Sequence, residues 1–122
     1  MQEYPDEKFE KLIGKAMDSL PEKYMKKLNN VAVTYEETPS LDQRQKLKLR
    51  GNQSLYGLFE GVPQTARGHN YQNLPDKITI FKKPMIFTVD DEDALYKQIR
   101  KTLWHEIAHH FGLGHEEIHA LE

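Results

Sequence analysis

Residues 103–115 read Leu-Trp-His-Glu-Ile-Ala-His-His-Phe-Gly-Leu-Gly-His and contain H-E-x-x-H, extended here to H-E-x-x-H-x-x-G-x-x-H. Each residue of a helix turns by about 100°, so His105 and His109 lie one turn apart, about 40° round the axis, and both imidazoles can reach one metal ion. Glu106 lies on the flank of the same face, where its carboxylate can take a proton from a water held on the metal. The spacing predicts a zinc site with its own general base.

A third ligand is expected after the helix ends. Gly112 tolerates the left-handed conformation found just past a helical C-terminus, so the chain can fold back there. His115 is the nearest strong candidate beyond that reversal, and three protein donors leave the fourth zinc position open, as in catalytic sites. Nickel, cobalt and iron also accept imidazole ligands, but zinc is favoured by the motif and by availability. The competing candidates for the third ligand are Glu116, Glu117 and His119.

The helix that carries the motif has separate apolar and polar faces. With His105 taken as zero, an arc from about 120° to 240° holds side chains suited to packing, namely Tyr96, Ile99, Leu103, Ile107 and Phe111. His110, at about 140°, belongs to that arc and is predicted to pack against the core. The two ligand histidines lie outside the arc, beside the polar side chains of Gln98, Lys101 and Thr102.

Composition indicates a soluble protein of one domain, spanning residues 1–122. The chain has no cysteine, so disulfides and thiolate zinc sites are excluded. Neither a signal peptide nor a run of about 20 apolar residues is present, which makes the cytoplasm the expected location and a membrane partner unexpected. The net charge of −2 argues against a nucleic-acid binder. Basic clusters at 44–50 and Lys82-Lys83 are predicted to be solvated faces.

Apolar spacing before the motif predicts a mixture of helices and strands. Residues 6–20 have the i, i+3, i+4, i+7 spacing of an amphipathic helix, and a second short helix is expected after Pro21. The polar stretch 36–50 is predicted to be a surface connection, partly helical, and 85–87 a short apolar segment across the core. β-Branched and aromatic residues predict strands at 31–35, 55–60 and 77–81.

Signals at both ends bound the motif helix. Asp90 is predicted to cap its N-terminus, with Val89 and Ala94 packing together as a hydrophobic staple. The helix is predicted to run to about Phe111, and a last helical turn is expected at 116–121.

A long polar loop is predicted at 65–75. It contains His69 and Tyr71, and either side chain can donate a hydrogen bond to an oxyanion. Because a lone histidine in a Gly/Asn-rich loop is more often solvent-exposed than catalytic, exposure is the favoured interpretation for His69.

The segments 9–22, 55–63, 74–81 and 105–112 together resemble one known family. They are similar to the small bacterial zincin-like proteins called minimal metalloproteases, formerly a domain of unknown function, and the middle segments are the specific part. The resemblance implies an α+β, zincin-like fold, with a small mixed sheet packed on an N-terminal helix and on the long active-site helix. It also implies an edge strand beside the zinc that pairs with an extended peptide or protein substrate.

The sequence departs from related patterns at two points. The family commonly has an acidic residue near position 115, where this chain has His115, as metzincins do. The third ligand therefore stays open between His115 and its neighbours. Metzincins also have a methionine turn after the zinc motif, whereas this sequence ends at Glu122. The lower half of the usual cleft is expected to be missing or supplied by a protein partner.

Metal-assisted hydrolysis of peptide bonds is the predicted function, with zinc on His105, His109 and His115 and with Glu106 as general base. Two alternatives stay open. A zinc-stabilised module can bind a peptide on its edge strand without cutting it. The three histidines also fit H-x3-H-x5-H, similar to the zinc site of bacterial ribosomal-RNA-maturation endoribonucleases. Those nucleases lack a glutamate directly after the first histidine and need a more basic face than this chain has.

Overall fold

The structure is a computed structural model that describes residues 1–28, 31–46, 56–61, 76–112 and 116. At positions 46, 109 and 110 it describes the backbone alone. In chain order the elements are α1 (Asp6–Ser19), α2 (Glu22–Met25), β1 (Val31–Glu36), α3 (Leu41–Lys46), β2 (Gly57–Glu60), β3 (Asp76–Phe81), α4 (Lys82–Ile86) and α5 (Glu92–His110).

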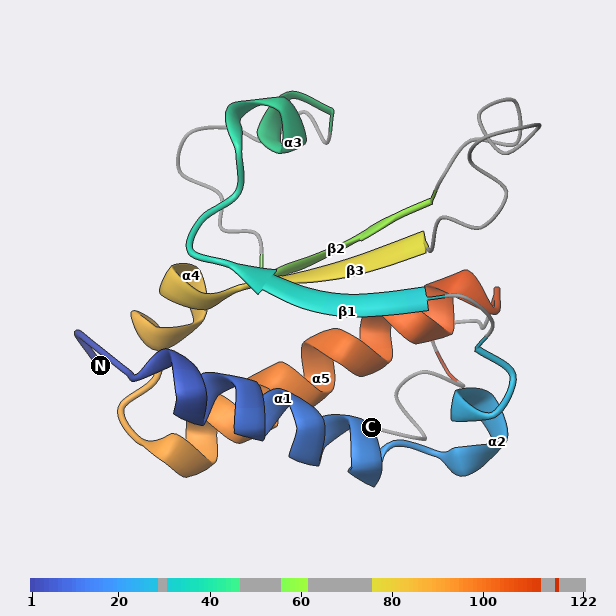
Figure 1. Cartoon of the computed structure of the whole chain (residues 1–122), viewed down its shortest axis with the longest axis horizontal. Coiled ribbons are helices and arrows are strands. Elements are labelled where there is room, and N and C mark those ends of the chain that lie inside the picture. Colours follow the sequence, from blue (N-terminus) through green and yellow to red (C-terminus); the bar gives the residue numbers. More distant parts are fainter. Residues whose placement is uncertain (29–30, 47–55, 62–75, 113–115, 117–122) are drawn as a thin grey trace.

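The three strands form one mixed sheet in the order β1-β3-β2. β1 runs parallel to β3, whereas β2 runs antiparallel to it, with Gly57 opposite Ile80 and Glu60 opposite Lys77. α1 and α5 lie side by side against one face of the sheet, and α3 lies on the opposite side (Figure 1). The fold is therefore the predicted α+β class, a small mixed sheet covered by helices.

The core lies between the sheet and the two long helices. α1 turns its apolar face inward, with Phe9 and Ala16 fully buried, as the spacing of its apolar residues predicted. The central strand β3 contributes Ile78 and Ile80, which are also fully buried. α5 contributes the fully buried side chains of Leu95, Ile99, Leu103, Trp104 and Ile107. Burial of Ile99, Leu103 and Ile107 confirms most of the predicted packing arc, and Leu95 and Trp104 extend the buried face beyond its two limits.

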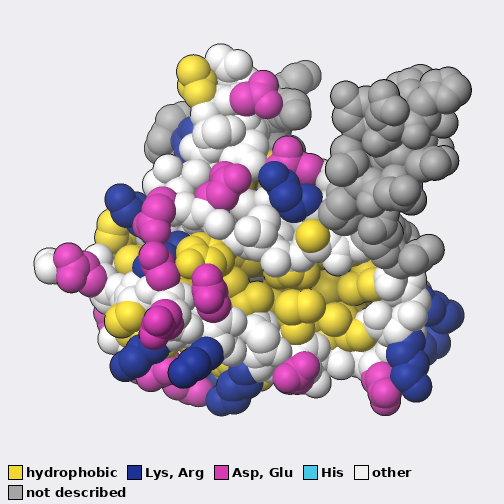
Figure 2. Space-filling view, in the orientation of Figure 1, with side chains coloured by type: hydrophobic (Ala, Val, Ile, Leu, Met, Phe, Trp, Pro, Cys, Tyr) yellow, Lys and Arg dark blue, Asp and Glu magenta, His cyan; other side chains and the backbone are white. Residues whose placement is uncertain are grey.

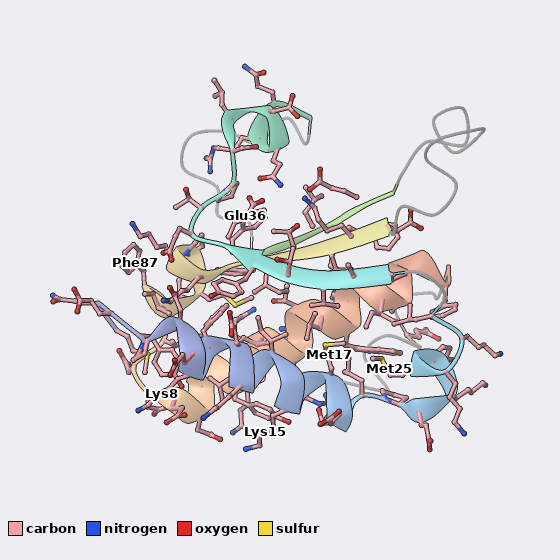
Figure 3. The ribbon with its side chains drawn as sticks, in the orientation of Figure 1. Lys8, Lys15, Met17, Met25, Glu36 and Phe87 are labelled. Carbon is pink, nitrogen blue, oxygen red and sulfur yellow. The ribbon has the colours of Figure 1, made fainter. Side chains whose placement is uncertain are left out.

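Hydrophobic side chains also reach the surface between β1 and α1, where they form a visible apolar band (Figure 2). Val33 and Tyr35 of β1 line a hollow at this place. Met17 points from α1 toward the sheet, whereas Lys15 points from the same helix away from it (Figure 3). α1 is therefore amphipathic in space as well as in sequence.

Two predictions, for the start of α5 and for the segment 85–87, are wrong in detail. α5 begins one residue later than predicted, because Asp91 rather than Asp90 caps it: the backbone N–H of Ala94 donates to Oδ1 of Asp91 at 2.7 Å. The residues after β3 form the helical turn α4. This turn buries Met85 and Ile86 but leaves Phe87 63% exposed, so the segment 85–87 does not lie across the core as a whole.

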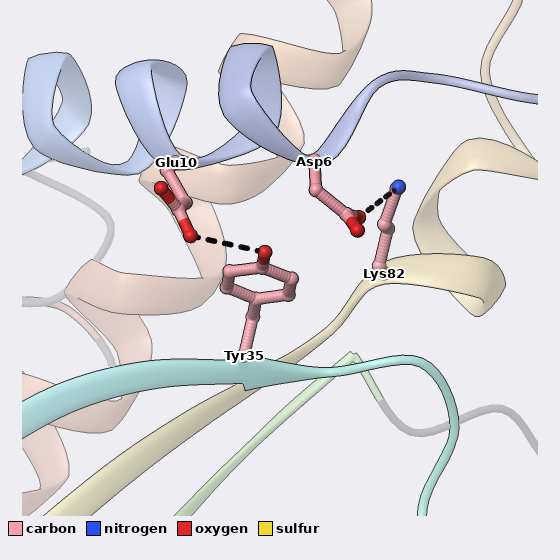
Figure 4. Close-up of polar contacts among 4 residues, drawn as sticks. All are labelled: Asp6, Glu10, Tyr35 and Lys82. Atoms are coloured by element: carbon pink, nitrogen blue, oxygen red, sulfur yellow. Dashed lines mark hydrogen bonds and ion pairs between the residues drawn. The ribbon is translucent and has the colours of Figure 1, made fainter.

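The prediction that Lys82 lies on a solvated face is wrong. Lys82 is only 6% exposed, because α4 turns it toward α1, where its Nζ lies 2.5 Å from Oδ1 of Asp6 (Figure 4). Nearby, the hydroxyl of Tyr35 in β1 donates a hydrogen bond to Glu10 in α1 at 3.1 Å. These two polar contacts tie α1 to the sheet and to α4.

We expect Asp6→Asn to lower the free energy of unfolding by about 1–2 kcal/mol, because it leaves a buried ammonium without its partner charge. Asp93→Asn is the matched control, since Asp93 also lies in the first turn of a helix but pairs with an exposed lysine. Its cost should stay below about 0.5 kcal/mol. Urea unfolding measures both, and equal costs would contradict a structural role for the Lys82 pair.

Candidate functional site

The helix α5 carries three of the predicted site residues. His105 and Glu106 are both partly buried near its C-terminal end, and His109 follows one turn later. Glu116, a candidate third ligand, is exposed. The structure does not describe the side chain of His109 or any part of the remaining ligand candidates, which are His115, Glu117 and His119.

Several other predictions also fall outside the described residues. They concern the packing of the His110 side chain, the roles of His69 and Tyr71, the loop at 65–75 and most of the turn at 116–121. These stay predictions. Gly112 is described, and its φ of 69° is the left-handed conformation expected where the motif helix ends.

His105 and Glu106 line a pocket of about 370 Å³ between α5 and β2. Gly57 and the preceding Tyr56 form the strand wall of this pocket. The helix wall extends toward the start of α5 through Gln98, Lys101 and Thr102. These are the polar side chains predicted to share a face with the motif. A larger hollow of about 600 Å³ lies elsewhere, at the N-terminal segment and Lys82, and none of the candidate site residues lines it.

The carboxylate of Glu106 accepts a hydrogen bond from the backbone N–H of Phe59 in β2. Burial raises the pKa of Glu106, and the hydrogen bond from Phe59 partly offsets this effect because it stabilises the charged form. The carboxyl group is thus held at the strand beside His105, in surroundings that favour a bound proton more than water does.

β2 is an edge strand among the described strands, and its alternation decides which backbone groups face outward. The N–H of Phe81 in β3 donates to the carbonyl of Tyr56 at 2.9 Å, so the backbone carbonyl of Tyr56 points toward β3. In an antiparallel pair the residues alternate, which directs the backbone groups of Gly57 and Phe59 away from β3. The bond from Phe59 to Glu106 agrees with this alternation.

A glycine permits β2 to approach α5 closely. A Cβ atom built on Gly57 would lie 2.5 Å from Cγ2 of Thr102, a distance that real Cβ atoms essentially never show. Thr102 is only 8% exposed, and its χ1 is restricted by β-branching, so it has little room to move. Sequence reasoning overlooked this contact. The available signal was a glycine inside a predicted strand, which often marks a close backbone approach.

The donor set of the motif suits a zinc ion. Imidazole nitrogen and carboxylate oxygen are both zinc ligands, and Nε2 of His105 is buried beside the pocket rather than in bulk water. Among the side chains that the structure describes, no three His, Asp or Glu groups gather as a metal site. His105 is the one predicted histidine ligand whose side chain is described.

A family model described as "Zincin-like metallopeptidase" matches residues 28–122. This chain belongs to that family. The residues that match the zincin-like model include β1, β2 and β3 and the whole of α5, and so both walls of the pocket. The resemblance inferred from the sequence is therefore confirmed at the level of the family.

A solved structure shares the zincin-like chain's fold, with a TM-score of 0.64, and covers 88% of this chain and 94% of its own. It is described as a conserved hypothetical protein from "Thermo thermophilus" and is 19% identical in sequence, so the likeness concerns the fold alone. No curated protein sequence matches the chain. Within the described part of the chain, no helix has the length and apolar character needed to cross a membrane.

We expect Gly57→Ala to push β2 away from α5 and to cost about 1–3 kcal/mol of folding free energy, as overpacking does. Gly61→Ala, just after the end of the same strand, is the control, because a Cβ there makes only ordinary contacts of 3.6 Å. Urea unfolding gives both values. A Gly57→Ala variant as stable as Gly61→Ala would contradict the close approach.

A double variant tests whether contact with Thr102 causes the expected loss of stability in Gly57→Ala. Thr102→Ser removes Cγ2 but keeps the hydroxyl oxygen that accepts a hydrogen bond from Gln98. If the clash is with Cγ2, adding Thr102→Ser to Gly57→Ala should recover part of the lost stability. Simple addition of the two single costs would place the strain elsewhere.

Proposed function

We propose that this protein is a zinc-dependent metallopeptidase that hydrolyses peptide bonds. The observation that carries the proposal is the position of Glu106, on the wall of a pocket beside His105 and within a hydrogen bond of the edge strand β2. In this proposal His105, His109 and His115 hold the zinc ion. Zinc held there would lower the pKa of a water molecule to about 7 and polarise the scissile carbonyl.

Glu106 is proposed as the general base. Its carboxylate takes a proton from the attacking water and later delivers it to the leaving amine. A raised pKa suits both steps, because the group that accepts the proton must also keep it until the amine departs. The hydrogen bond from Phe59 restrains the carboxylate of Glu106 and so supports a fixed geometry for the proton transfer.

The substrate is proposed to be an extended peptide that adds a strand to β2. The N–H of Phe59 is engaged by Glu106, but the N–H and C=O of Gly57 and the C=O of Phe59 also point away from β3, and a peptide can form main-chain hydrogen bonds with them along this edge. Such pairing would place its backbone next to His105 and Glu106. Side chains on alternate residues of the peptide would then face the pocket or the solvent.

Binding without turnover is the second candidate function. The bond from Phe59 to Glu106 supports it, because a carboxylate engaged by the edge strand can serve a purely structural role there. The family assignment favours either of these functions over the endoribonuclease alternative.

We expect Glu106→Gln to retain zinc and to lower peptide hydrolysis by at least about a hundredfold, as the loss of a general base does. Asp93→Asn, at the exposed start of the same helix, should hydrolyse peptides at the parent rate. Mass spectrometry of a diverse peptide mixture detects new termini, which a chelator should abolish. Hydrolysis by Glu106→Gln at the parent rate would show that the base is another group.

The third ligand can be assigned from zinc retained after dialysis. We expect one zinc per parent chain, a strong loss in His115→Ala and parent-like retention in the three alternatives, Glu116→Ala, Glu117→Ala and His119→Ala. Losing one of three protein ligands leaves too few donors for tight binding. Full retention in His115→Ala, with loss in one of the other variants, would transfer the role to that residue.

A further inference from the structure

The pocket beside His105 contains a lysine at its rim. Lys101 lies one helical turn before His105 and lines the pocket with an exposed side chain. Lys26, Lys82 and Lys97 form ion pairs with carboxylates, whereas no carboxylate in the described part of the chain pairs with Lys101. Its charge is therefore available to a group that enters the pocket.

Further hydrogen-bond donors lie on the same helix wall. Nε2 of Gln98 donates to Oγ1 of Thr102 at 3.1 Å, so one amide hydrogen of Gln98 and the hydroxyl hydrogen of Thr102 are left for other acceptors. Both residues line the pocket next to Lys101. This part of the pocket thus combines a cation with neutral donors, which is the complement of an anionic oxygen pair.

The only acidic side chain on the described pocket wall is Glu106, and it lies at the opposite end of the helix segment. Glu106 lies five positions after Lys101, a rise of about 7.5 Å along the axis. Its carboxylate is engaged by the N–H of Phe59 at the strand. The repulsion that Glu106 exerts on an anion near Lys101 is accordingly weaker than the attraction from the adjacent ammonium.

We propose that this pocket binds a carboxylate of the peptide substrate, next to the bond that is cut, through Lys101, Gln98 and Thr102. This inference rests on the proposed function, because it assigns a substrate class to the same site. A volume of about 370 Å³ accommodates a single side chain or a chain end rather than a folded partner. The carboxylate comes either from an Asp or Glu side chain or from the C-terminus of a short peptide.

The first test measures selectivity during cleavage. A diverse peptide library first identifies a sequence that is cut and the position of the cut. Zinc-loaded protein is then given versions of that peptide, blocked at both ends, that differ only in having Glu, Gln or Leu next to the cut. We expect kcat/KM for the Glu peptide to exceed that for the Gln peptide about fivefold, the upper range for one exposed charge pair. A matched peptide pair with a free or amidated C-terminus next to the cut tests the second carboxylate source.

Variants of Lys101 test the assignment to this residue. Lys101→Met should bring the ratio of Glu to Gln peptides close to one, and Lys101→Glu should reverse it. Lys97→Met and Lys97→Glu are the controls, because Lys97 lies one turn earlier on α5, pairs with Asp93 and does not line the pocket. They should keep the parent ratio. A preference that survives Lys101→Met, or cleavage with no preference for a carboxylate of either source, overturns the inference.

A binding measurement separates this inference from the proposed function. Fluorescence anisotropy with the same labelled peptides is recorded for Glu106→Gln, alone and combined with Lys101→Met. Tighter binding of carboxylate peptides that is lost with Lys101→Met supports the pocket even if no protein cleaves any peptide, and the peptidase proposal alone then fails. Cleavage without carboxylate selectivity contradicts the carboxylate-binding inference and leaves the peptidase proposal standing. If neither cleavage nor selective binding is seen, both are wrong.

Discussion

The close contact between β2 and α5 is the constraint on which the rest of the site depends. Gly57 has no Cβ, and this absence lets the strand approach within van der Waals contact of Thr102, where any larger residue would meet Cγ2. Two positions further along the strand, the N–H of Phe59 then reaches the carboxylate of Glu106. A strand held further from the helix would lose that hydrogen bond and would open the pocket to bulk solvent.

The topology of the sheet decides which backbone groups of β2 face Glu106 and a peptide. Because β2 is antiparallel and lies at an edge of the described sheet, alternate residues direct their backbone groups toward the helix side and away from β3. The same strand therefore restrains Glu106 through the N–H of Phe59 and leaves the backbone groups of Gly57 and the carbonyl of Phe59 on its outer side for a peptide. Fully buried residues of β3 and α5, among them Ile80 and Leu103, fix the sheet and helix relative to each other. The packed core thus fixes the two elements that carry the proposed site.

The sequence predicted the parts of this account that depend on local periodicity. The apolar spacing of α1, the packing arc at Ile99 and Leu103, and the helical position of His105 and Glu106 all follow from the 3.6-residue repeat. The family was also recognisable from the motif and the middle segments. These features need no knowledge of which elements meet in space.

The features that the sequence did not predict depend on tertiary distances. Lys82 is buried because α4 turns it toward Asp6, a partner 76 residues away in sequence. The donor to Glu106 is a backbone N–H, which every residue except proline possesses, so no residue type could identify it. Asp90 and Asp91 are equally good caps by type, and the turn geometry selects Asp91.

The most direct test is diffraction at the zinc absorption edge from crystals grown with zinc. We expect an anomalous peak about 2.0–2.1 Å from a ring nitrogen of His105, on the side of the pocket. The carboxylate of Glu106 should lie near the ion without being its ligand, and should still accept the N–H of Phe59. A peak away from His105, or a Glu106 side chain turned into the core, would contradict the account.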